Sequence, residues 1–194
     1  VADPPPPYPT ESATNDAEVV RRPDGPKLQV PAGFRVEEFA RGFRDPRYLC
    51  TAPNGDIFVT ESRANAIKVL HVAGSDGKPE AAQTFTTEAL NKPFGLAFYP
   101  PGPDPQYLYV ATTDGVIRFP CRNGDLKSRG PAEKLGAHLS PGGLLHGGGH
   151  WTRDLAFSPN GKIMYVSIGS ASNVSDDSAE ADRARIFEFN PDGT

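Results

Sequence analysis

The stretch RDLAFSPNGKIMYVSIG, residues 153–169, decides the fold of this 194-residue chain. It places two short apolar runs on either side of the tripeptide Pro159-Asn160-Gly161. Asn-Gly is the strongest short-range hairpin signal, because two-residue hairpin turns require positive φ at their central positions. The stretch therefore predicts two antiparallel strands joined by a tight turn.

The same arrangement occurs twice more along the chain. Each unit has a strand, a turn rich in proline and glycine, a second strand with many β-branched residues, a variable loop and a third strand. The three units are 47–62 with 66–70, 94–100 with 107–113 and 115–119, and 153–169 with 185–189. Weaker fourth strands are expected at 83–85 and 132–135. Units of about 50 residues that each form a small meandering sheet are typical of β-propeller blades.

The repeat predicts an all-β fold with about three propeller blades in this chain. We expect the blades at about 28–90, 91–145 and 146–194. Propellers usually have about four to eight blades, so three do not close a ring and would leave an open sheet edge. We therefore expect the N-terminal half of a longer protein. A short form that closes by oligomerising is the alternative.

Residues 1–27 differ in composition from the rest of the chain. They alternate prolines with charged and small polar residues, which favours an extended, solvated backbone. We expect a tail or linker that lies over a neighbouring surface and could dock a protein partner. The sequence Val1-Ala2-Asp3 has neither the charged nor the apolar region of a signal peptide. This absence is uninformative if the chain is a mature product, because a signal would already have been removed.

Overall charge and cysteine content exclude several classes of protein. The net charge is −4 and no long basic block occurs, so we expect no nucleic-acid partner. No apolar run approaches the ~20 residues of a membrane helix, so we expect no membrane span. Cys50 and Cys121 are too few for a disulfide framework. Two buried free thiols are expected, with a single bridge as the alternative.

His150, in the run GGGHWTRD at 147–154, is the main candidate for chemistry. It precedes the innermost strand of the third blade, and the loop at this position lies at the rim of the central channel. An imidazole titrates near neutral pH and is the most common general base. The glycines before it allow close approach of the backbone to a ligand. The alternative is a loop histidine hydrogen-bonded within its own blade.

Neighbouring side chains allow several roles. His146 lies four residues before His150, but the glycines between them exclude the helix that a paired-histidine zinc motif needs. Trp151 could stack on a planar ligand or pack between blades. Arg153 and Asp154 could form a structural pair, orient His150, or bind an anionic ligand.

Three further features are weaker candidates. Glu61 and Ser62 could face the channel or cap a turn. Asn173-Val174-Ser175 matches a glycosylation acceptor, a triplet that is common by chance. The acidic residues at 176–182 do not have the spacing of a calcium loop and are expected to be a solvated loop.

Three stretches resemble the glucose/sorbosone dehydrogenase family, whose members are quinoprotein sugar dehydrogenases built as six-bladed propellers. Residues 58–69 are similar to the family's "TER…GKI" strand pair, and 94–100 resemble its "GFAFHP" strand. Residues 150–169 resemble its "HxSGRL…IGD" segment without a gap. The resemblance covers residues 28–194 and is greater to the sorbosone-dehydrogenase-like branch.

The resemblance implies an activity. The family's histidine that matches His150 takes the proton from a sugar hydroxyl while hydride passes to pyrroloquinoline quinone (PQQ). It implies a sugar or aldehyde substrate, an external electron acceptor, a bound Ca²⁺ and a periplasmic or secreted location. Arg153, Asp154, Lys92 and Asn91 are the candidate cofactor contacts in this chain. Most of the family's cofactor contacts, and its calcium site, would lie beyond residue 194.

Two departures from the family pattern stand out. The family has an aspartate just before the catalytic histidine, and this chain has Gly149. A family glutamine that contacts the cofactor falls near Leu90, with Asn91 and Lys92 as possible substitutes. Gly149 leaves open a non-catalytic propeller, a binding or scaffold subunit that has lost the site. A calcium-dependent lactonase-type propeller is a further alternative, for which Glu61 and Asn173 are the only partial ligand set.

Overall fold

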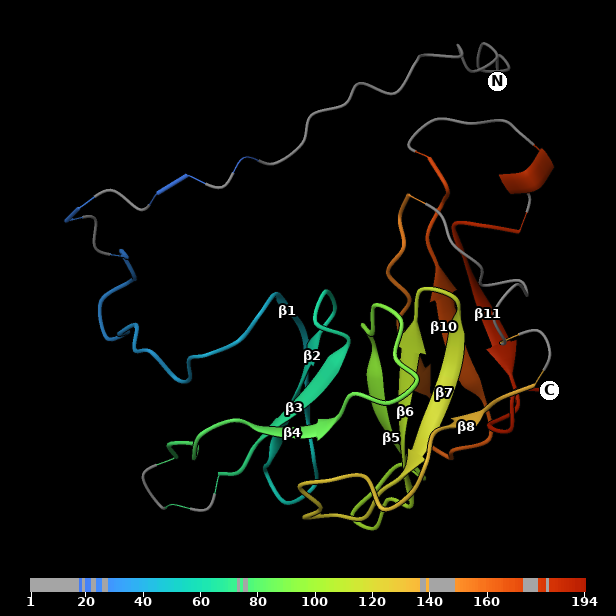
Figure 1. Cartoon of the computed structure of the whole chain (residues 1–194), viewed down its shortest axis with the longest axis horizontal. Helices are drawn as coiled ribbons and strands as arrows, with labels where there is room; N and C mark the ends of the chain where they lie inside the picture. The colour runs from blue at the N-terminus through green and yellow to red at the C-terminus, as the bar shows by residue number, and fades with distance from the viewer. Residues whose placement is uncertain are drawn as a thin grey trace.

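The computed structural model describes residues 18, 20–21, 24–25, 28–72, 74, 77–136, 139, 149–172, 178–180 and 182–194. These residues form three antiparallel sheets (Figure 1). The first contains β1 (Pro46–Thr51), β2 (Ile57–Glu61), β3 (Ala66–Leu70) and β4 (Gln83–Thr86). The second contains β5 (Leu96–Tyr99), β6 (Tyr107–Thr112), β7 (Gly115–Pro120) and β8 (Glu133–Lys134). The third contains β9 (Leu155–Phe157), β10 (Met164–Ile168) and β11 (Arg185–Phe189).

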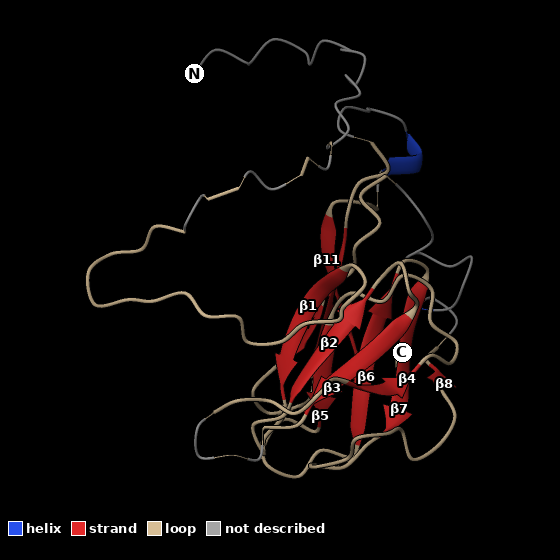
Figure 2. Cartoon of the chain, turned by 60° about the vertical axis from the view of Figure 1, so that its left-hand side comes forward, coloured by secondary structure: helices blue, strands red, loops and turns tan. Residues whose placement is uncertain are grey.

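Each sheet is a simple meander in which consecutive strands are hydrogen-bonded neighbours. The predicted fold class, an all-β propeller with about three blades present, is confirmed. Both predicted outer strands form, as β4 and β8. A short 3₁₀ helix, η2 (Ser178–Glu180), precedes β11 (Figure 2). Among the described residues, no helix is long and apolar enough to cross a membrane.

The three sheets lie side by side like adjacent blades of a fan (Figure 1). The first strand of each sheet contacts the first strand of the next, because β1 lies against β5 and β5 against β9. This arrangement places β1, β5 and β9 along the inner edge of the ring. The exact blade boundaries stay a prediction, and most of the proline-rich tail lies outside the described residues.

Aromatic side chains fill the space between the sheets. Between the first two sheets, the Phe58 ring packs edge-on against Phe85 and Phe98, with ring centroids 5.1 Å apart in both pairs. Between the second and third sheets, Tyr109 and Phe157 meet at 4.9 Å. Such edge-to-face pairs stabilise a core by about 0.5–1.5 kcal/mol beyond the area that they bury.

The β1–β2 hairpin forms as predicted, but its turn differs from the expected type. The Ala52 amide donates to the Asp56 carbonyl at 2.8 Å, which makes a three-residue loop. Only Gly55 in this loop has positive φ, at 92°. A two-residue turn centred on Asn54-Gly55, another Asn-Gly pair, does not form because the Asn54 carboxamide takes another role. It donates to the Asp56 carboxylate at 2.7 Å and accepts from the Asp56 amide at 3.2 Å.

A buried carboxylate joins this turn to the end of β3. Asp56 is 1% exposed and its Oδ1 lies 2.8 Å from His71 Nδ1. The same oxygen accepts from the Val72 amide at 3.2 Å. Buried carboxylates are retained when their lone pairs are satisfied in this way. Asp56 and His71 therefore have a structural role at the end of the sheet away from residue 150.

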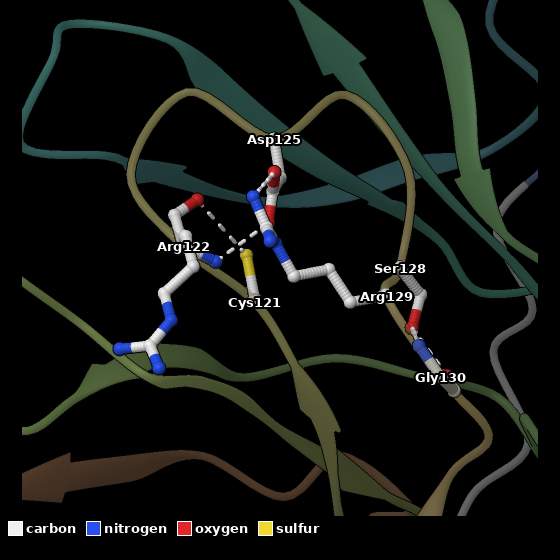
Figure 3. Close-up of polar contacts among 6 residues, drawn as sticks. All are labelled: Cys121, Arg122, Asp125, Ser128, Arg129 and Gly130. Atoms are coloured by element: carbon white, nitrogen blue, oxygen red, sulfur yellow. Dashed lines mark hydrogen bonds and ion pairs between the residues drawn. The ribbon is translucent and has the colours of Figure 1, made fainter.

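The loop after β7 folds around a second carboxylate (Figure 3). Asp125 accepts from Arg129 Nε at 2.5 Å and Nη2 at 2.8 Å, and from the Arg122 amide at 2.7 Å. The Arg129 hydrogen bonds hold the pKa of Asp125 below its usual range. The Arg122 guanidinium points away from Asp125 (Figure 3). This loop closes over Cys121 and lies at the same end of the sheets as Asp56.

Both cysteines are free, as expected; Cys121 is buried, whereas Cys50 is only partly buried. Burial, with a smaller contribution from Asp154, raises the pKa of the Cys50 thiol to about 11. Burial, with a smaller contribution from Asp125, raises that of Cys121 to about 12. Because the thiolate is the reactive form, both thiols should be inert at neutral pH.

The inner strands of the second and third sheets meet at Gly95. The Gly95 amide donates to the Arg153 carbonyl at 3.0 Å. A Cβ on Gly95 would lie 2.7 Å from the Asp154 Cα and would also collide with its carboxylate. Only glycine fits here, so this contact fixes where β9 begins.

We predict that Gly95→Ala destabilises the fold by about 1–3 kcal/mol, because the new methyl group must displace backbone atoms of the next sheet. Chemical denaturation measures the difference. Gly130→Ala is the matched control, since its Cβ would meet only Pro120 at 3.4 Å. We expect that control to change stability by less than about 0.5 kcal/mol. Equal destabilisation by both substitutions would contradict the proposed inter-sheet contact.

We also predict that native protein at pH 8 reacts slowly with iodoacetamide. The raised thiol pKa values leave little thiolate at that pH. Mass spectrometry should find full labelling of both cysteines only after denaturation in guanidinium. Rapid labelling of Cys121 in the folded protein would show that the pKa of its thiol is not raised.

Candidate functional site

His150 lies just before β9, with an exposed side chain. Its backbone amide donates to the Ser170 carbonyl at 3.0 Å. Its ring nitrogen Nδ1 lies 2.7 Å from Ser170 Oγ and 3.2 Å from the Ser170 carbonyl oxygen. Within the described part of the chain, Nε2 has no hydrogen-bond partner. The ring is thus held at one nitrogen and open at the other.

Two glycines bring the His150 segment against the residues that follow β10. The Gly149 amide donates to the Ala171 carbonyl at 2.8 Å, and a Cβ on Gly149 would lie 2.5 Å from that oxygen. A Cβ on Gly169 would lie 2.6 Å from the His150 Cβ. An aspartate in place of Gly149 would not fit this backbone arrangement. The departure from the family pattern at Gly149 is therefore a requirement of close packing.

Arg153 is fully buried, and its side chain binds backbone carbonyls of the His150 segment. Its Nη1 donates to the His150 carbonyl at 2.7 Å and to the Thr152 carbonyl at 3.0 Å. Burial, with the nearby charge of Arg183, lowers the pKa of Arg153 to about 10, so it stays charged at neutral pH. These contacts support a positioning role for Arg153 behind His150. Its predicted contact with a cofactor stays a prediction.

Asp154 faces the inner edge of the first sheet. Its Oδ1 accepts from the Leu155 amide at 2.8 Å, and its own amide donates to Ser167 Oγ at 3.0 Å. Burial, then the Asp154 charge and a hydrogen bond to it, raise the pKa of the Tyr48 hydroxyl. Tyr48 and Asp154 line a cleft of about 240 Å³ that extends across the third sheet to Ile186 of β11. Whether Asp154 meets a cofactor also stays a prediction.

Two cations and the Phe94 ring gather around Trp151, the residue that follows His150 in the chain. The Arg47 guanidinium carbon lies 5.7 Å from the centre of the Trp151 ring and 6.0 Å from that of Phe94. Lys92 Nζ lies 5.6 Å from the Trp151 ring centre. The Phe94 and Trp151 rings meet edge to face at 6.3 Å. We call Arg47, Lys92, Phe94 and Trp151 the cationic–aromatic cluster.

The cluster unites residues from all three sheets, because its members come from β1, the loop before β5 and the loop before β9. Lys92 has positive φ, at 45°, and its amide donates to the Asn65 side chain at 2.8 Å. Such a backbone conformation is uncommon for residues other than glycine. The structure thus brings Lys92 to Trp151, the residue after His150. Asn91 points elsewhere, because its carboxamide donates to the Asp114 carboxylate at 3.0 Å.

Glu61 and Ser62 hold neighbouring segments in place. Glu61 is 2% exposed and accepts from the Arg44 amide, with Lys68 Nζ 4.0 Å away. Ser62 Oγ donates to the Pro93 carbonyl at 2.6 Å. His146, Asn173, Asp176 and Asp177 lie outside the described residues. In the part that is described, no three histidine, cysteine or acidic side chains converge on a possible metal position.

Sequence reasoning missed two residues of this site. Arg47 appeared to be an ordinary residue of an inner strand, and only the packing of β1 against β5 and of β5 against β9 brings it to Trp151. Ser170 follows Gly169 at the end of the "IGD"-like stretch, which was the available signal. Its contact with His150 spans 20 residues and depends on the pairing of two loops.

Several solved structures have a similar fold. The pyranose dehydrogenase PQQ domain of Coprinopsis cinerea, solved in its holo form, has a TM-score of 0.67 and 18% identity, over 85% of this chain and 39% of that chain. A family AA12 carbohydrate-active enzyme of Trichoderma reesei has a TM-score of 0.62 and 20% identity, over 79% and 38%. The PQQ-bound aldose sugar dehydrogenase of Streptomyces coelicolor has a TM-score of 0.52 and 20% identity, over 81% and 48%.

At these identities the solved structures establish similarity of fold. The chain spans less than half the length of each of these three proteins. A comparison with curated proteins finds no match. The model of the TrAA12-like family matches residues 28–192. The family resemblance seen in the sequence is confirmed, and the chain belongs to the TrAA12-like family.

Proposed function

We propose that this chain forms the His150-bearing part of a quinoprotein sugar or aldehyde dehydrogenase. The observation that carries the proposal is the geometry at His150, whose Nδ1 is held by Ser170 while Nε2 has no partner among the residues that the structure describes. A neutral imidazole held in this way can accept a proton at Nε2. Membership of the TrAA12-like family and the folds of the sugar dehydrogenases support this assignment.

The cationic–aromatic cluster fits the cofactor that we propose. PQQ is a flat tricarboxylate, and when bound it supplies the hydride acceptor. Arg47 and Lys92 offer two positive charges, and Trp151 and Phe94 offer flat apolar surface beside them. Arginine suits carboxylates because its planar fork can donate two parallel hydrogen bonds. These residues would hold one side of the cofactor, next to His150.

His150 would act on the substrate at a single atom. Nε2 would take the proton from the hydroxyl of the carbon that is oxidised, as the C–H hydride leaves for the cofactor. General-base catalysis of this kind contributes about 10²–10⁴-fold to a rate. Arg153 would support the step by holding the His150 carbonyl from the buried side.

The remaining features of the enzyme lie further from these residues. We propose a bound Ca²⁺, an external electron acceptor and a periplasmic or secreted location on the basis of the family resemblance. The Ca²⁺ would need ligands other than the described residues, which contain no suitable cluster. A non-catalytic propeller is the competing function. The main support for that function was the glycine at position 149. The close contact of Gly149 with the Ala171 carbonyl explains the glycine by packing, so it need not mean that the catalytic site has been lost.

We predict that His150→Ala lowers kcat about 10²–10⁴-fold in the whole protein loaded with PQQ and Ca²⁺, because the general base is lost. Aldoses and an artificial electron acceptor provide the assay. PQQ affinity, measured separately, should stay within a few-fold. Lys162→Ala, at an exposed turn far from the cluster, is the control. Equal activity of His150→Ala and the wild type would remove His150 from the mechanism.

We predict that Arg47→Ala and Lys92→Ala each weaken PQQ binding about 10-fold, which corresponds to about 1.4 kcal/mol. Isothermal titration with PQQ measures the affinity at low and high salt, and the losses should shrink as salt rises. Arg122→Ala, a cation at the opposite end of the second sheet, is the control and should bind normally. Unchanged affinity in both cluster variants would exclude this cluster as the cofactor site.

A further inference from the structure

We infer that Ser170 is a positioning residue of the His150 ring and that it selects the ring tautomer with the proton on Nδ1. The consequence for catalysis rests on the proposed function, whereas the tautomer itself does not. A base must present an unprotonated nitrogen to its substrate, so the tautomer decides which nitrogen is available. Here the nitrogen that remains available is Nε2, the one directed away from Ser170.

Two oxygen atoms of Ser170 lie within hydrogen-bond distance of His150 Nδ1. The Ser170 carbonyl oxygen, 3.2 Å away, can only accept a hydrogen bond. Ser170 Oγ, 2.7 Å away, can accept or donate. Both contacts are satisfied together when Nδ1 carries the proton. In the other tautomer, with the proton on Nε2, the lone pair of Nδ1 would face the lone pairs of the Ser170 carbonyl oxygen.

The segment that carries Ser170 is anchored on both sides. On one side, Gly169 allows the backbone to pass directly under His150. On the other, the Ala171 amide donates to both carboxylate oxygens of Glu180, at 3.0 Å each, and the Ala171 carbonyl accepts from Gly149. The Ser170 hydroxyl is therefore held at a fixed place rather than on a free loop. A fixed partner restricts the imidazole ring to one orientation.

The partner is also neutral. In many enzymes a carboxylate holds the ring nitrogen opposite the reacting one and stabilises the charged ring. In this chain a hydroxyl and a carbonyl orient the ring without adding negative charge. A carboxylate side chain at position 149 would not fit, because a Cβ there would collide with the Ala171 carbonyl oxygen. Ser170 thus supplies the orientation of the ring that such a carboxylate would otherwise provide.

Nitrogen NMR of the protein labelled with ¹⁵N-histidine tests the tautomer directly. In wild type at a pH where the ring is neutral, we expect a protonated, pyrrole-like Nδ1 and a bare, pyridine-like Nε2 for His150. Ser170→Ala removes the nearer acceptor at 2.7 Å and leaves the Nδ1 proton only the carbonyl oxygen at 3.2 Å, so it should raise the share of the Nε2-protonated form severalfold. Ser170→Thr, which keeps the hydroxyl, should restore the wild-type signals. His71, whose Nδ1 lies against Asp56, is an internal control and should not change.

Activity of the whole protein loaded with PQQ and Ca²⁺ gives the second readout. We expect Ser170→Ala to lower kcat about 10-fold with little change in KM, and Ser170→Thr to recover most of it. Ser128→Ala, which removes a serine hydroxyl at the opposite end of the second sheet, should leave both constants unchanged. A thermal melt of each variant checks that the fold is intact.

The outcomes separate the two proposals. A tautomer shift in Ser170→Ala in a protein without dehydrogenase activity would uphold the role of Ser170 and overturn the proposed function. A wild-type ring protonated on Nε2, or identical tautomer populations in wild type and Ser170→Ala, would overturn the role of Ser170. A loss of stability in Ser170→Ala without a tautomer shift would show that the hydroxyl only supports the loop, which also overturns it.

Discussion

Close backbone contact at three glycines is the constraint on which the rest of the site depends. Gly95 lets the second sheet touch the first residues of the third, and Gly149 and Gly169 let the two loops around β9 and β10 approach each other. Each contact would be blocked by a methyl group. Together they fix the start of β9, and with it the position of His150, relative to the inner strands of all three sheets.

The propeller could be predicted from local sequence because its blades are built from local hairpins. Turn residues and the strand-like segments between them predicted the order of the strands, including both outer strands. The small number of cysteines favoured free thiols. The type of the β1–β2 turn could not be predicted, since the Asn54 side chain bonds to Asp56 instead of leaving the backbone to a two-residue turn. The number of residues in the turn depends on side-chain hydrogen bonds of this kind, and an Asn-Gly dipeptide alone does not reveal them.

The site was predictable only in part. His150 was found from its glycines and from a family resemblance, but the residues that complete its surroundings come from other sheets. Arg47 and Ser170 reach His150 and Trp151 through contacts between segments that no periodic pattern links. Gly149 was the most misleading residue, because the sequence shows a missing carboxylate and only the backbone shows the Ala171 oxygen that excludes it.

Paired loops hold His150 with Nδ1 against Ser170, and in the described part of the chain Nε2 has no partner. The cationic–aromatic cluster forms around the next residue, Trp151. A crystal structure of the protein, with the distance from His150 Nδ1 to Ser170 Oγ as the deciding quantity, tests this arrangement most directly. The account predicts a hydrogen-bond distance close to 2.7 Å and intact pairing of Gly149 with Ala171. A His150 ring turned away from Ser170, with the two loops separated, would contradict it.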